Sequence, residues 1–393
     1  MQYRIDKRSG NKLSVLSLGC MRFPRIMGKT DMKASEKLIL EAIEKGINYF
    51  DTAYIYPGSE ETLGTILKKN KLRDKVYIAT KLSMTLRRSK EDFEKCLNIQ
   101  LKRLKTDYID YYLVHNLTDL NMWKKLKDLG IESWIKEKKK EGKIKHIGFS
   151  FHGSQNEFLK ILDDYDWEFC MIQYNYMNIN YQAGKTGLLA AHKKGISVMI
   201  MEPLLGGKLA VNLPKKALNA LKKSNDKLSP AGWALKWLWN QTEVTTVLSG
   251  MNKLEQLNDN VEVANTSSVN MMSKEEVETI NKVIDIFNES YKVNCTGCNY
   301  CMPCPKGVNI PAALSSYNAY YVMGKIEGIK QYILSIGITS GTNNCISNCT
   351  SCTLCEKNCP QEIEIIKELK KAKKKIEPFW IKWILKTVKR IFK

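Results

Sequence analysis

Four polar side chains of the kinds that transfer protons follow apolar runs in the first third of the chain. Asp51 lies at the end of the run 47–52, Tyr56 follows in the next loop, Lys81 follows the run 76–80, and His115 follows the run 108–114. Each residue alone is weak evidence, since a single His after a strand is more often a structural hydrogen-bonding residue and Asp-Thr is often a helix cap. If the runs are parallel strands, however, their ends share one rim, and acid–base groups converge there. A buried ion pair that only stabilises the rim would leave Tyr56 unexplained.

A second set of reactive residues lies near the C-terminus, where nine of the 12 cysteines fall between Cys295 and Cys359. In a large chain without a secretory signal, this clustering favours metal binding over disulfides. The second group has the Cys-x2-Cys-x2-Cys-x3-Cys-Pro spacing of bacterial ferredoxins, and the first group differs by one residue in its last gap. Zinc needs only four ligands and does not call for two runs of four. We therefore predict iron–sulfur ligation, with two [4Fe–4S] clusters or at least one, by Cys295, Cys298, Cys301, Cys304, Cys349, Cys352, Cys355 and Cys359.

The remaining cysteines are given other roles. In two-cluster ferredoxins the fourth cysteine of each run ligates the other cluster, so Cys304 and Cys359 are candidates for exchange between the sites. Cys345 is a spare thiol, either an alternative ligand or a loop residue. Cys20, Cys96 and Cys170 are interpreted as core residues.

The elements that must position these residues are short β-branched runs alternating with segments of helical period, up to about residue 265. Eight runs qualify as strands: 16–19, 47–52, 76–80, 108–114, 144–149, 170–174, 196–201 and 244–248. An open doubly wound sheet would show the same alternation. The count of eight, with no Gly-x-Gly-x-x-Gly loop after an early strand, favours a (β/α)8 TIM barrel. We expect this barrel to be followed by a small α-helical ferredoxin-like iron–sulfur domain, with a helical insert over 312–334 between the cysteine groups.

Length and composition agree with one large and one small domain, since the chain has 393 residues, 44% of them hydrophobic and 26% charged. We predict a barrel over 1–290, a cluster domain over 291–365 and a basic amphipathic tail over 366–393. The polar N-terminus and the absence of a long apolar stretch predict a cytoplasmic protein. The net charge of +21 is interpreted mainly as solvated lysine, although it could attract acidic partners, and we expect no nucleic-acid partner.

The tail is a separate question. After Pro378, apolar residues from Ile381 to Phe392 share one helical face and basic residues occupy the other. This pattern is typical of an interfacial membrane helix, so residues 379–393 could make weak contact with a membrane surface. A terminal helix docked on the barrel, with its lysines in water, explains the pattern slightly better.

Over residues 10 to 265 the sequence resembles the aldo-keto reductase family. The matching stretches include 46–53 (GINYFDTA), 79–81 (ATK), 112–115 (YLVH), 147–150 (IGFS), 173–175 (QYN) and 202–204 (EPL). The stretch 295–305 (CTGCNYCMPCP) is similar to that of an iron–sulfur branch of the same family. The resemblance implies a catalytic tetrad of Asp51, Tyr56, Lys81 and His115.

These roles are chemically reasonable. Hydride transfer to a carbonyl places negative charge on its oxygen, so a proton donor must lie within hydrogen-bond reach, and Tyr56 would be that donor. Lys81 would lower the pKa of the Tyr56 phenol, and Asp51 would keep Lys81 charged and oriented. His115 would donate a hydrogen bond to the substrate oxygen.

The resemblance also implies a nicotinamide dinucleotide, NADP(H) or NAD(H), bound along the same rim. Ser150 and Gln173 would bind the carboxamide, and Met201 would lie where relatives stack an aromatic ring. The adenosine end would meet Ser249, Gly250, Gln256 and Asn260. The arginine that many NADP-dependent relatives use is not evident, and Lys253 is the nearest cation in the sequence. The family's habit favours NADP.

The sequence therefore predicts an NAD(P)H-dependent reductase of a small aldehyde or ketone, with clusters for electron transfer or structure and with a possible electron-transfer partner. Hydride carries two electrons and a cluster takes one, and no flavin signature is visible, so direct reduction of the clusters by nucleotide is not expected. Two alternatives remain. A partner ferredoxin or flavoprotein could drive the barrel, or the chain could be a redox-sensing or electron-transfer subunit that binds nucleotide without carbonyl turnover.

Overall fold

The computed structural model describes residues 1–83, 89–211, 213–322, 324–336 and 344–377. Contacts between residues divide the chain into two compact units. Unit 1 comprises 1–204 and 231–273, and unit 2 comprises 205–230 and the chain from 274 onward. This division differs from the boundary at 290/291 expected from composition, because two segments that precede residue 291 pack with the cysteine-rich region.

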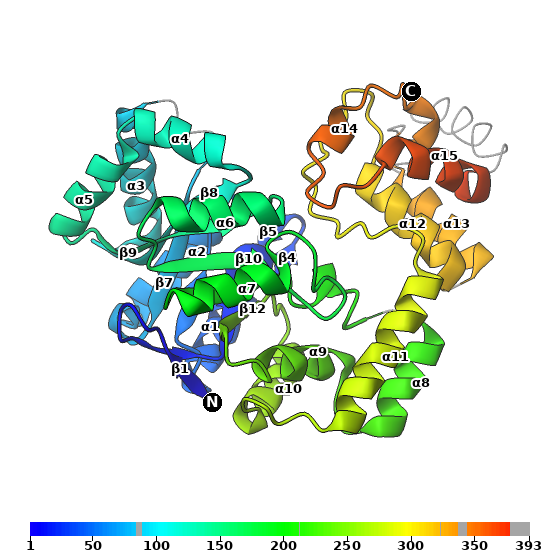
Figure 1. Ribbon diagram of the computed structural model, residues 1–393, viewed down its shortest axis with the longest axis horizontal. Helices are drawn as coiled ribbons and strands as arrows, with labels where there is room; N and C mark the ends of the chain where they lie inside the picture. Colours follow the sequence, from blue (N-terminus) through cyan, green and yellow to red (C-terminus); the bar gives the residue numbers. More distant parts are fainter. Residues whose placement is uncertain (84–88, 212, 323, 337–343, 378–393) are drawn as a thin grey trace. The chain divides into compact units, whose positions relative to one another are not determined.

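Unit 1 is a closed barrel of eight parallel strands (Figure 1), as the sequence predicts. Around the barrel the strands follow the order β10, β11, β12, β3, β6, β7, β8, β9. Their bounds are β3 Leu16–Gly19, β6 Tyr49–Asp51, β7 Tyr77–Leu82, β8 Ile109–Leu117, β9 Ile144–Phe151, β10 Phe169–Gln173, β11 Ser197–Met201 and β12 Val244–Ser249.

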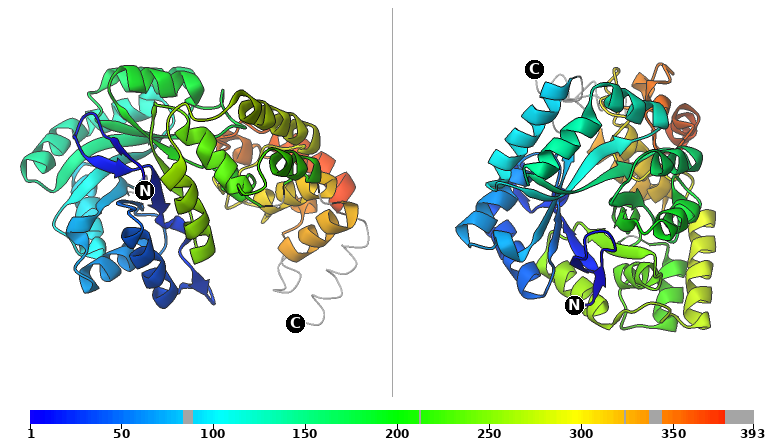
Figure 2. Two further views of the ribbon diagram at one scale, coloured as in Figure 1. Left: turned by 90° about the horizontal axis from the view of Figure 1, so that it is seen from below. Right: turned by 60° about the vertical axis from the view of Figure 1, so that its left-hand side comes forward.

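Helices surround the strands of unit 1 (Figure 2) and account for the apolar character of the strands on both faces. All nine residues of β8 are buried, for example. The helices are α1 Met32–Glu44, α2 Ser59–Lys69, α3 Lys90–Leu104, α4 Leu120–Asp128, α5 Ile131–Lys140, α6 Gln155–Asp164, α7 Gly184–Lys193, α9 Pro230–Trp239 and α10 Leu254–Thr266. Polar caps fix several starts: the Asp31 carboxylate accepts a hydrogen bond from the Ala34 backbone N–H, 3.0 Å away, at the start of α1.

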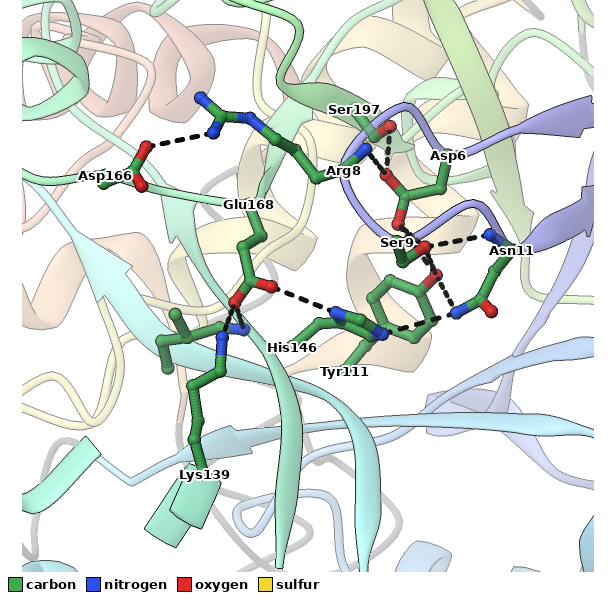
Figure 3. A network of polar contacts seen from close by, with 11 residues as sticks. Asp6, Arg8, Ser9, Asn11, Tyr111, Lys139, His146, Asp166, Glu168 and Ser197 are labelled. Carbon is green, nitrogen blue, oxygen red and sulfur yellow. Dashed lines mark hydrogen bonds and ion pairs between the residues drawn. The ribbon is translucent and has the colours of Figure 1, made fainter. Parts of the chain in front are cut away.

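A hairpin of β1 (Tyr3–Ile5) and β2 (Lys12–Ser14) lies against the first residues of several barrel strands. In its loop the buried Asp6 carboxylate accepts hydrogen bonds from Ser197 Oγ at 2.7 Å and from the Tyr111 hydroxyl at 2.9 Å (Figure 3). Next to it, His146 Nδ1 lies 3.1 Å from the Glu168 carboxylate, which also binds Lys139. This polar network closes the end of the barrel where the strands begin, opposite to the rim where the predicted catalytic residues lie.

Unit 2 contains α8 (Lys215–Ser224), α11 (Lys274–Ser290), α12 (Ile310–Val322), α13 (Lys325–Ser335), α14 (Leu354–Lys357) and α15 (Ile365–Ile376). Its apolar core combines Val308, Leu314, Tyr332 and Leu369 with Cys345. The predicted helical insert 312–334 is helical, but it forms two helices, because Gly324 between them has a positive φ of 105°. Cys345 is therefore a buried core thiol.

The predicted membrane-contacting tail, residues 379–393, lies outside the described residues. Among the residues that are described, no helix is both long and apolar enough to cross a membrane.

Candidate active site and cluster cavities

The ends of three neighbouring strands bring the predicted catalytic residues together in unit 1. Asp51 is the last residue of β6, Lys81 lies near the end of β7, and His115 lies near the end of β8. The Lys81 ammonium donates hydrogen bonds to both Asp51 carboxylate oxygens and to the Thr52 carbonyl oxygen, each at 2.7 Å. The side chains of Lys81 and Asp51 are only 2% and 6% exposed. The amine is thus held at a fixed position.

Tyr56 extends from the loop between β6 and α2 to the same place. Lys81 Nζ lies 5.0 Å from the centroid of the Tyr56 ring. The rings of Tyr56 and His115 meet edge to face, with centroids 6.4 Å apart. The four residues of the predicted tetrad therefore form one group.

The pKa of the Tyr56 phenol moves in the direction opposite to the one expected. Burial raises it well above the ordinary value, and the negative charges of Asp51 and Glu202 raise it further. Lys81 does not reverse this effect because both oxygens of Asp51 bind its ammonium, so the pair presents little net positive charge to the phenol. Tyr56 is consequently protonated at neutral pH and able to donate.

An irregularity at the end of β8 orients His115. The pairing of β8 with β9 shifts between Val114 and Leu117, and Asn116 has a positive φ of 55°. Ser150 Oγ on β9 accepts a hydrogen bond from the Asn116 backbone N–H at 2.8 Å and so anchors this turn. Ser150 was predicted to bind a nicotinamide carboxamide, and its position here also connects it to His115.

The end of β10 offers an amide that has no partner among the described residues. Gln173 is fully buried, and neither its amide nitrogen nor its amide oxygen has a hydrogen-bond partner in the described residues. It pairs in register with Met201, the half-buried last residue of β11. Buried polar atoms are normally satisfied, so these two atoms fit a ligand that both donates and accepts, as a carboxamide does.

The residues predicted for the adenosine end lie after β12 and on α10. Asn260 Nδ2 donates to Ser249 Oγ at 3.0 Å, and both side chains are buried. Gln256 Oε1 accepts from the Asn252 backbone N–H at 2.9 Å, while Gly250 is exposed. The sequence reasoning missed Arg22: a Cβ atom placed on Gly250 would lie 3.6 Å from Arg22 Cδ. The Arg22 side chain therefore lies beside this loop. Its position in the sequence, three residues after the first barrel strand, could have indicated that it lies at the rim.

Two further polar residues at this rim were not predicted as functional. Glu202 directly follows β11 with a φ of 52°, and its charge contributes to the raised pKa of Tyr56. His152 follows β9 and is buried. Burial lowers the pKa of its imidazole to about 4, and a hydrogen bond with Gln182 partly opposes this decrease. The position of His152 two residues beyond Ser150, on the same side of an extended chain, was a signal for it.

In unit 2 the eight predicted ligand cysteines line two cavities. Cys295, Cys298, Cys301 and Cys359 line the first, which we call the inner cavity. Cys304, Cys349, Cys352 and Cys355 line the second, the outer cavity, which Cys301 also borders. Cys304 and Cys359 are thus each grouped with the other run. Burial raises the pKa of Cys301 to about 12, and the nearby Cys295, Cys298 and Cys359 add to this rise. These three cysteines are the other members of the inner cavity, so the pKa shift reflects the same grouping.

The donor sets of these cavities suit a cluster. In the described residues no three His, Cys, Asp or Glu side chains converge on one point as ligands of a single ion do. Cysteine thiols of both runs line each cavity. Two side-chain atoms at the inner cavity, Thr296 Oγ1 and Gln361 Nε2, are buried and have no partner within the described residues. Both can donate hydrogen bonds to sulfur.

Comparison with known proteins finds two family matches. Residues 15–285 match the aldo/keto reductase family, and residues 294–364 match the 4Fe-4S dicluster domain. In an alignment 331 residues long, the sequence is 26% identical to L-glyceraldehyde 3-phosphate reductase of Escherichia coli O157:H7, and the match covers 72% of this chain and 92% of that protein. In an alignment 295 residues long, it is also 28% identical to the probable aldo-keto reductase 1 of Glycine max, and the match covers 64% of this chain and 81% of that protein.

A solved structure agrees with these matches. The holo form of an aldo-keto reductase from Bacillus halodurans is 26% identical, with a TM-score of 0.59. The superposition covers 72% of this chain and 96% of that one.

Proposed function

Because the chain belongs to the aldo/keto reductase family, we propose that this oxidoreductase reduces a small aldehyde or ketone with NADPH or NADH, and that Tyr56 is the proton donor. The observation that carries the proposal is the buried Lys81–Asp51 ion pair held against the Tyr56 ring and next to His115. A carbonyl oxygen that gains negative charge at this point meets a protonated phenol and an imidazole.

The chain's own residues have distinct tasks in this reaction. Tyr56 gives its proton to the carbonyl oxygen, and its high pKa keeps that proton available at neutral pH. His115 orients the substrate oxygen, and the turn anchored by Ser150 fixes its ring. Lys81 and Asp51 position the phenol ring.

The nucleotide supplies a hydride when bound. Gln173 would hold its carboxamide, with Ser150 and Met201 beside the ring. Ser249, Gly250, Gln256 and Asn260 would bind the adenosine end. No arginine for a phosphate of the nucleotide was evident in the sequence. Arg22 would provide that positive charge. This cation supports NADP(H), in agreement with the family's habit.

We further propose two [4Fe–4S] clusters, one in each cavity, with Cys304 and Cys359 exchanged between the two runs. Such clusters supply one-electron transfer when bound. Thr296 and Gln361 would then donate hydrogen bonds to sulfur in the inner cavity.

Tyr56→Phe tests the proton-donor role. The variant keeps the ring contacts with Lys81 and His115 and loses only the hydroxyl. We expect kcat/KM for carbonyl reduction to fall by about 10²–10⁴-fold, with the Kd for NADPH changed less than about threefold. Anaerobically purified protein would be assayed by NADPH absorbance against a panel of aldehydes and ketones that includes L-glyceraldehyde 3-phosphate, the substrate named for the E. coli relative.

Tyr54→Phe is the matched control. Tyr54 lies in the same loop, and its ring lies 4.5 Å from the Arg103 guanidinium, a contact that phenylalanine retains. This variant should reduce carbonyls normally. Normal turnover by Tyr56→Phe would refute the assignment and favour the alternative in which the barrel binds nucleotide without carbonyl chemistry.

A further inference from the structure

Helix α15 presents a uniformly basic face to solvent. Its apolar residues Ile365, Leu369, Ala372 and Ile376 are buried in the core of unit 2. The opposite side carries six exposed lysines, which we call the α15 lysine face: Lys367, Lys370, Lys371, Lys373, Lys374 and Lys375.

Most of this charge is not neutralised within the described residues. Lys367 pairs with Glu364, and Lys371 pairs with Glu368. The other four lysines make no ion pair in the part of the chain that the structure describes. Because lysines four residues apart repel one another along a helix, a negatively charged surface laid over this face would relieve the repulsion.

The α15 lysine face borders the outer cavity. Lys367, Lys370, Lys371 and Lys374 line a groove together with Glu356 and Ile366. Ile366 also lines the outer cavity, so one side chain is shared by the groove and the ligand cysteines. Glu356 directly follows Cys355 and accepts a hydrogen bond from the Ile366 backbone N–H at 2.8 Å. Cys352, another thiol of this cavity, is exposed.

We propose that the α15 lysine face is the docking surface for a small acidic one-electron carrier protein of the ferredoxin type. This inference rests on the proposed function in one respect, namely that the outer cavity holds a cluster. On docking, the reduced carrier loses one electron to that cluster, with no bond formed or broken and no proton transferred. The reverse exchange balances in the same way.

Charge and position favour this partner over others. Opposite charge accelerates encounter and fixes the orientation of the two proteins, as one-electron exchange requires. A membrane-binding helix would add large apolar residues beside its lysines, and a single-strand nucleic-acid surface would add aromatic ones. The fully exposed residues of α15 are all lysines, and the apolar Ile366 beside them is half-buried.

Charge reversal tests the proposal on the full-length, cluster-loaded protein. The triple variant Lys370→Glu, Lys373→Glu, Lys374→Glu would be compared with Lys215→Glu, Lys216→Glu, Lys222→Glu on α8. The α8 lysines are also exposed and belong to the same unit, so both variants change the net charge equally. The probe is a plant-type ferredoxin, with basic cytochrome c as a mismatched carrier. Binding would be measured by interferometry from 20 to 300 mM salt, and electron transfer from dithionite-reduced ferredoxin by stopped flow.

We expect the α15 variant to raise the Kd for ferredoxin at least about tenfold and to slow electron transfer in parallel, and the α8 variant to change each less than about twofold. The wild-type Kd should rise with salt. Equal weakening by both variants, or by neither, would overturn the proposal. So would α15-dependent binding of phosphatidylserine vesicles or of oligonucleotides with ferredoxin binding unchanged.

Iron content, the electron paramagnetic resonance of the clusters and carbonyl reduction are measured on the same samples. Failure of the docking proposal leaves these three intact. Failure of the proposed function appears as absent clusters or absent carbonyl turnover, whichever variant is tested.

Discussion

The direction of the pKa shift at Tyr56 has a chemical consequence. A phenol that holds its proton at neutral pH suits the reduction of a carbonyl, where it must donate. Oxidation of an alcohol requires the phenolate as acceptor, which burial disfavours here. We therefore expect carbonyl reduction at neutral pH to use the protonated phenol, and alcohol oxidation to become faster as the pH rises.

Glu202→Gln tests the electrostatic part of this argument. Removing the negative charge stabilises the phenolate, so the pKa of Tyr56 should fall. The value of kcat/KM for reduction is lost as Tyr56 deprotonates, so it should begin to fall at a lower alkaline pH in Glu202→Gln than in the wild type. Glu255→Gln on α10 is the control, because its carboxylate is not among the charges that raise this pKa. A fall that began at the same pH in Glu202→Gln and in the wild type would contradict the assignment.

Thr296→Val tests the hydrogen bonding at the inner cavity. Loss of the hydroxyl donor should lower the reduction potential of one cluster and leave the other unchanged, because hydrogen bonds to sulfur stabilise the reduced state. A tenfold change in the reduced-to-oxidised ratio corresponds to about 59 mV for one electron, and we expect a shift of that order in a redox titration followed by electron paramagnetic resonance.

Thr350 provides the comparison for Thr296. It follows the first cysteine of the second run, as Thr296 follows that of the first, but its side chain is exposed. Thr350→Val should therefore leave both potentials within a few millivolts of wild type, since water already competes for its hydroxyl. If the two variants behaved alike, burial of Thr296 would have no role in the potential.

At the scale of elements, the two ends of the barrel strands perform different tasks. The ends of β6, β7, β8 and β10 carry the proposed chemistry, whereas the starts of β8, β9, β10 and β11 are held by the polar network of Figure 3. Within that network, burial opposes the ionisation of Glu168. Hydrogen bonds from His146, Lys139 and the Ile147 backbone N–H outweigh it and lower the pKa of Glu168 to about 2.

Glu168→Gln should therefore destabilise unit 1 in a pH-dependent way. Because the folded-state pKa is depressed, the stability that Glu168 contributes is present above about pH 4.5 and is lost as the pH falls toward 2. With allowance for solvent screening we expect about 1–2 kcal/mol at pH 7 and little difference from wild type near pH 2. Tryptophan fluorescence is the appropriate probe, since six of the eight tryptophans lie in unit 1. A difference that is constant with pH would contradict the linkage.

The strands could be predicted from sequence because a parallel strand is buried on both faces and its composition records that burial. All eight predicted runs are strands, to within about three residues at their ends. The irregularity at Asn116 could not be predicted, because a register shift depends on the partner strand and on Ser150. The break at Gly324 divides an otherwise continuous helical pattern, and one glycine is insufficient warning of it.

The predicted tetrad converges because strand ends are fixed by topology. Arg22 and Glu202 were missed for a related reason. Arg22 ends a short 3-10 helix after β3, and Glu202 lies in the loop after β11, so neither belongs to a segment whose course the strand pattern encodes. The sign of the pKa shift at Tyr56 was also beyond the sequence, since it depends on how completely Asp51 neutralises Lys81.

At the scale of the whole molecule, the two units have separate cores, one inside the barrel and one around Val308, Leu314 and Tyr332. The core of unit 2 is small and surrounds the two cavities. Because metal binding contributes folding free energy to such domains, removal of iron should destabilise unit 2 much more than unit 1.

Chelation under air tests this expectation. We expect two thermal transitions in the iron-depleted protein, with the transition of unit 2 lowered by at least about 10 °C. Tryptophan fluorescence and NADPH binding, which follow unit 1, should change little. Hydrogen exchange resolved by peptide would assign the transitions. Simultaneous loss of both units would show that the barrel depends on the clusters.

Unit 2 is discontinuous along the chain, because residues 205–230, from the connection between β11 and β12, belong to it together with the C-terminal region. Within that unit Lys208 donates a hydrogen bond to the carbonyl oxygen of Cys295, the first residue of the cysteine runs, and a Cβ on Gly206 would lie 2.6 Å from the Thr296 carbonyl oxygen. The cysteine-rich region is therefore not a structural unit by itself, because it is complete only with residues 205–230. Grafting residues 291–393 onto another barrel would transfer the ligands without the loop that supports them, so a recombinant chimera, or an ancestral gene fusion, would have to remodel a barrel loop at the same time.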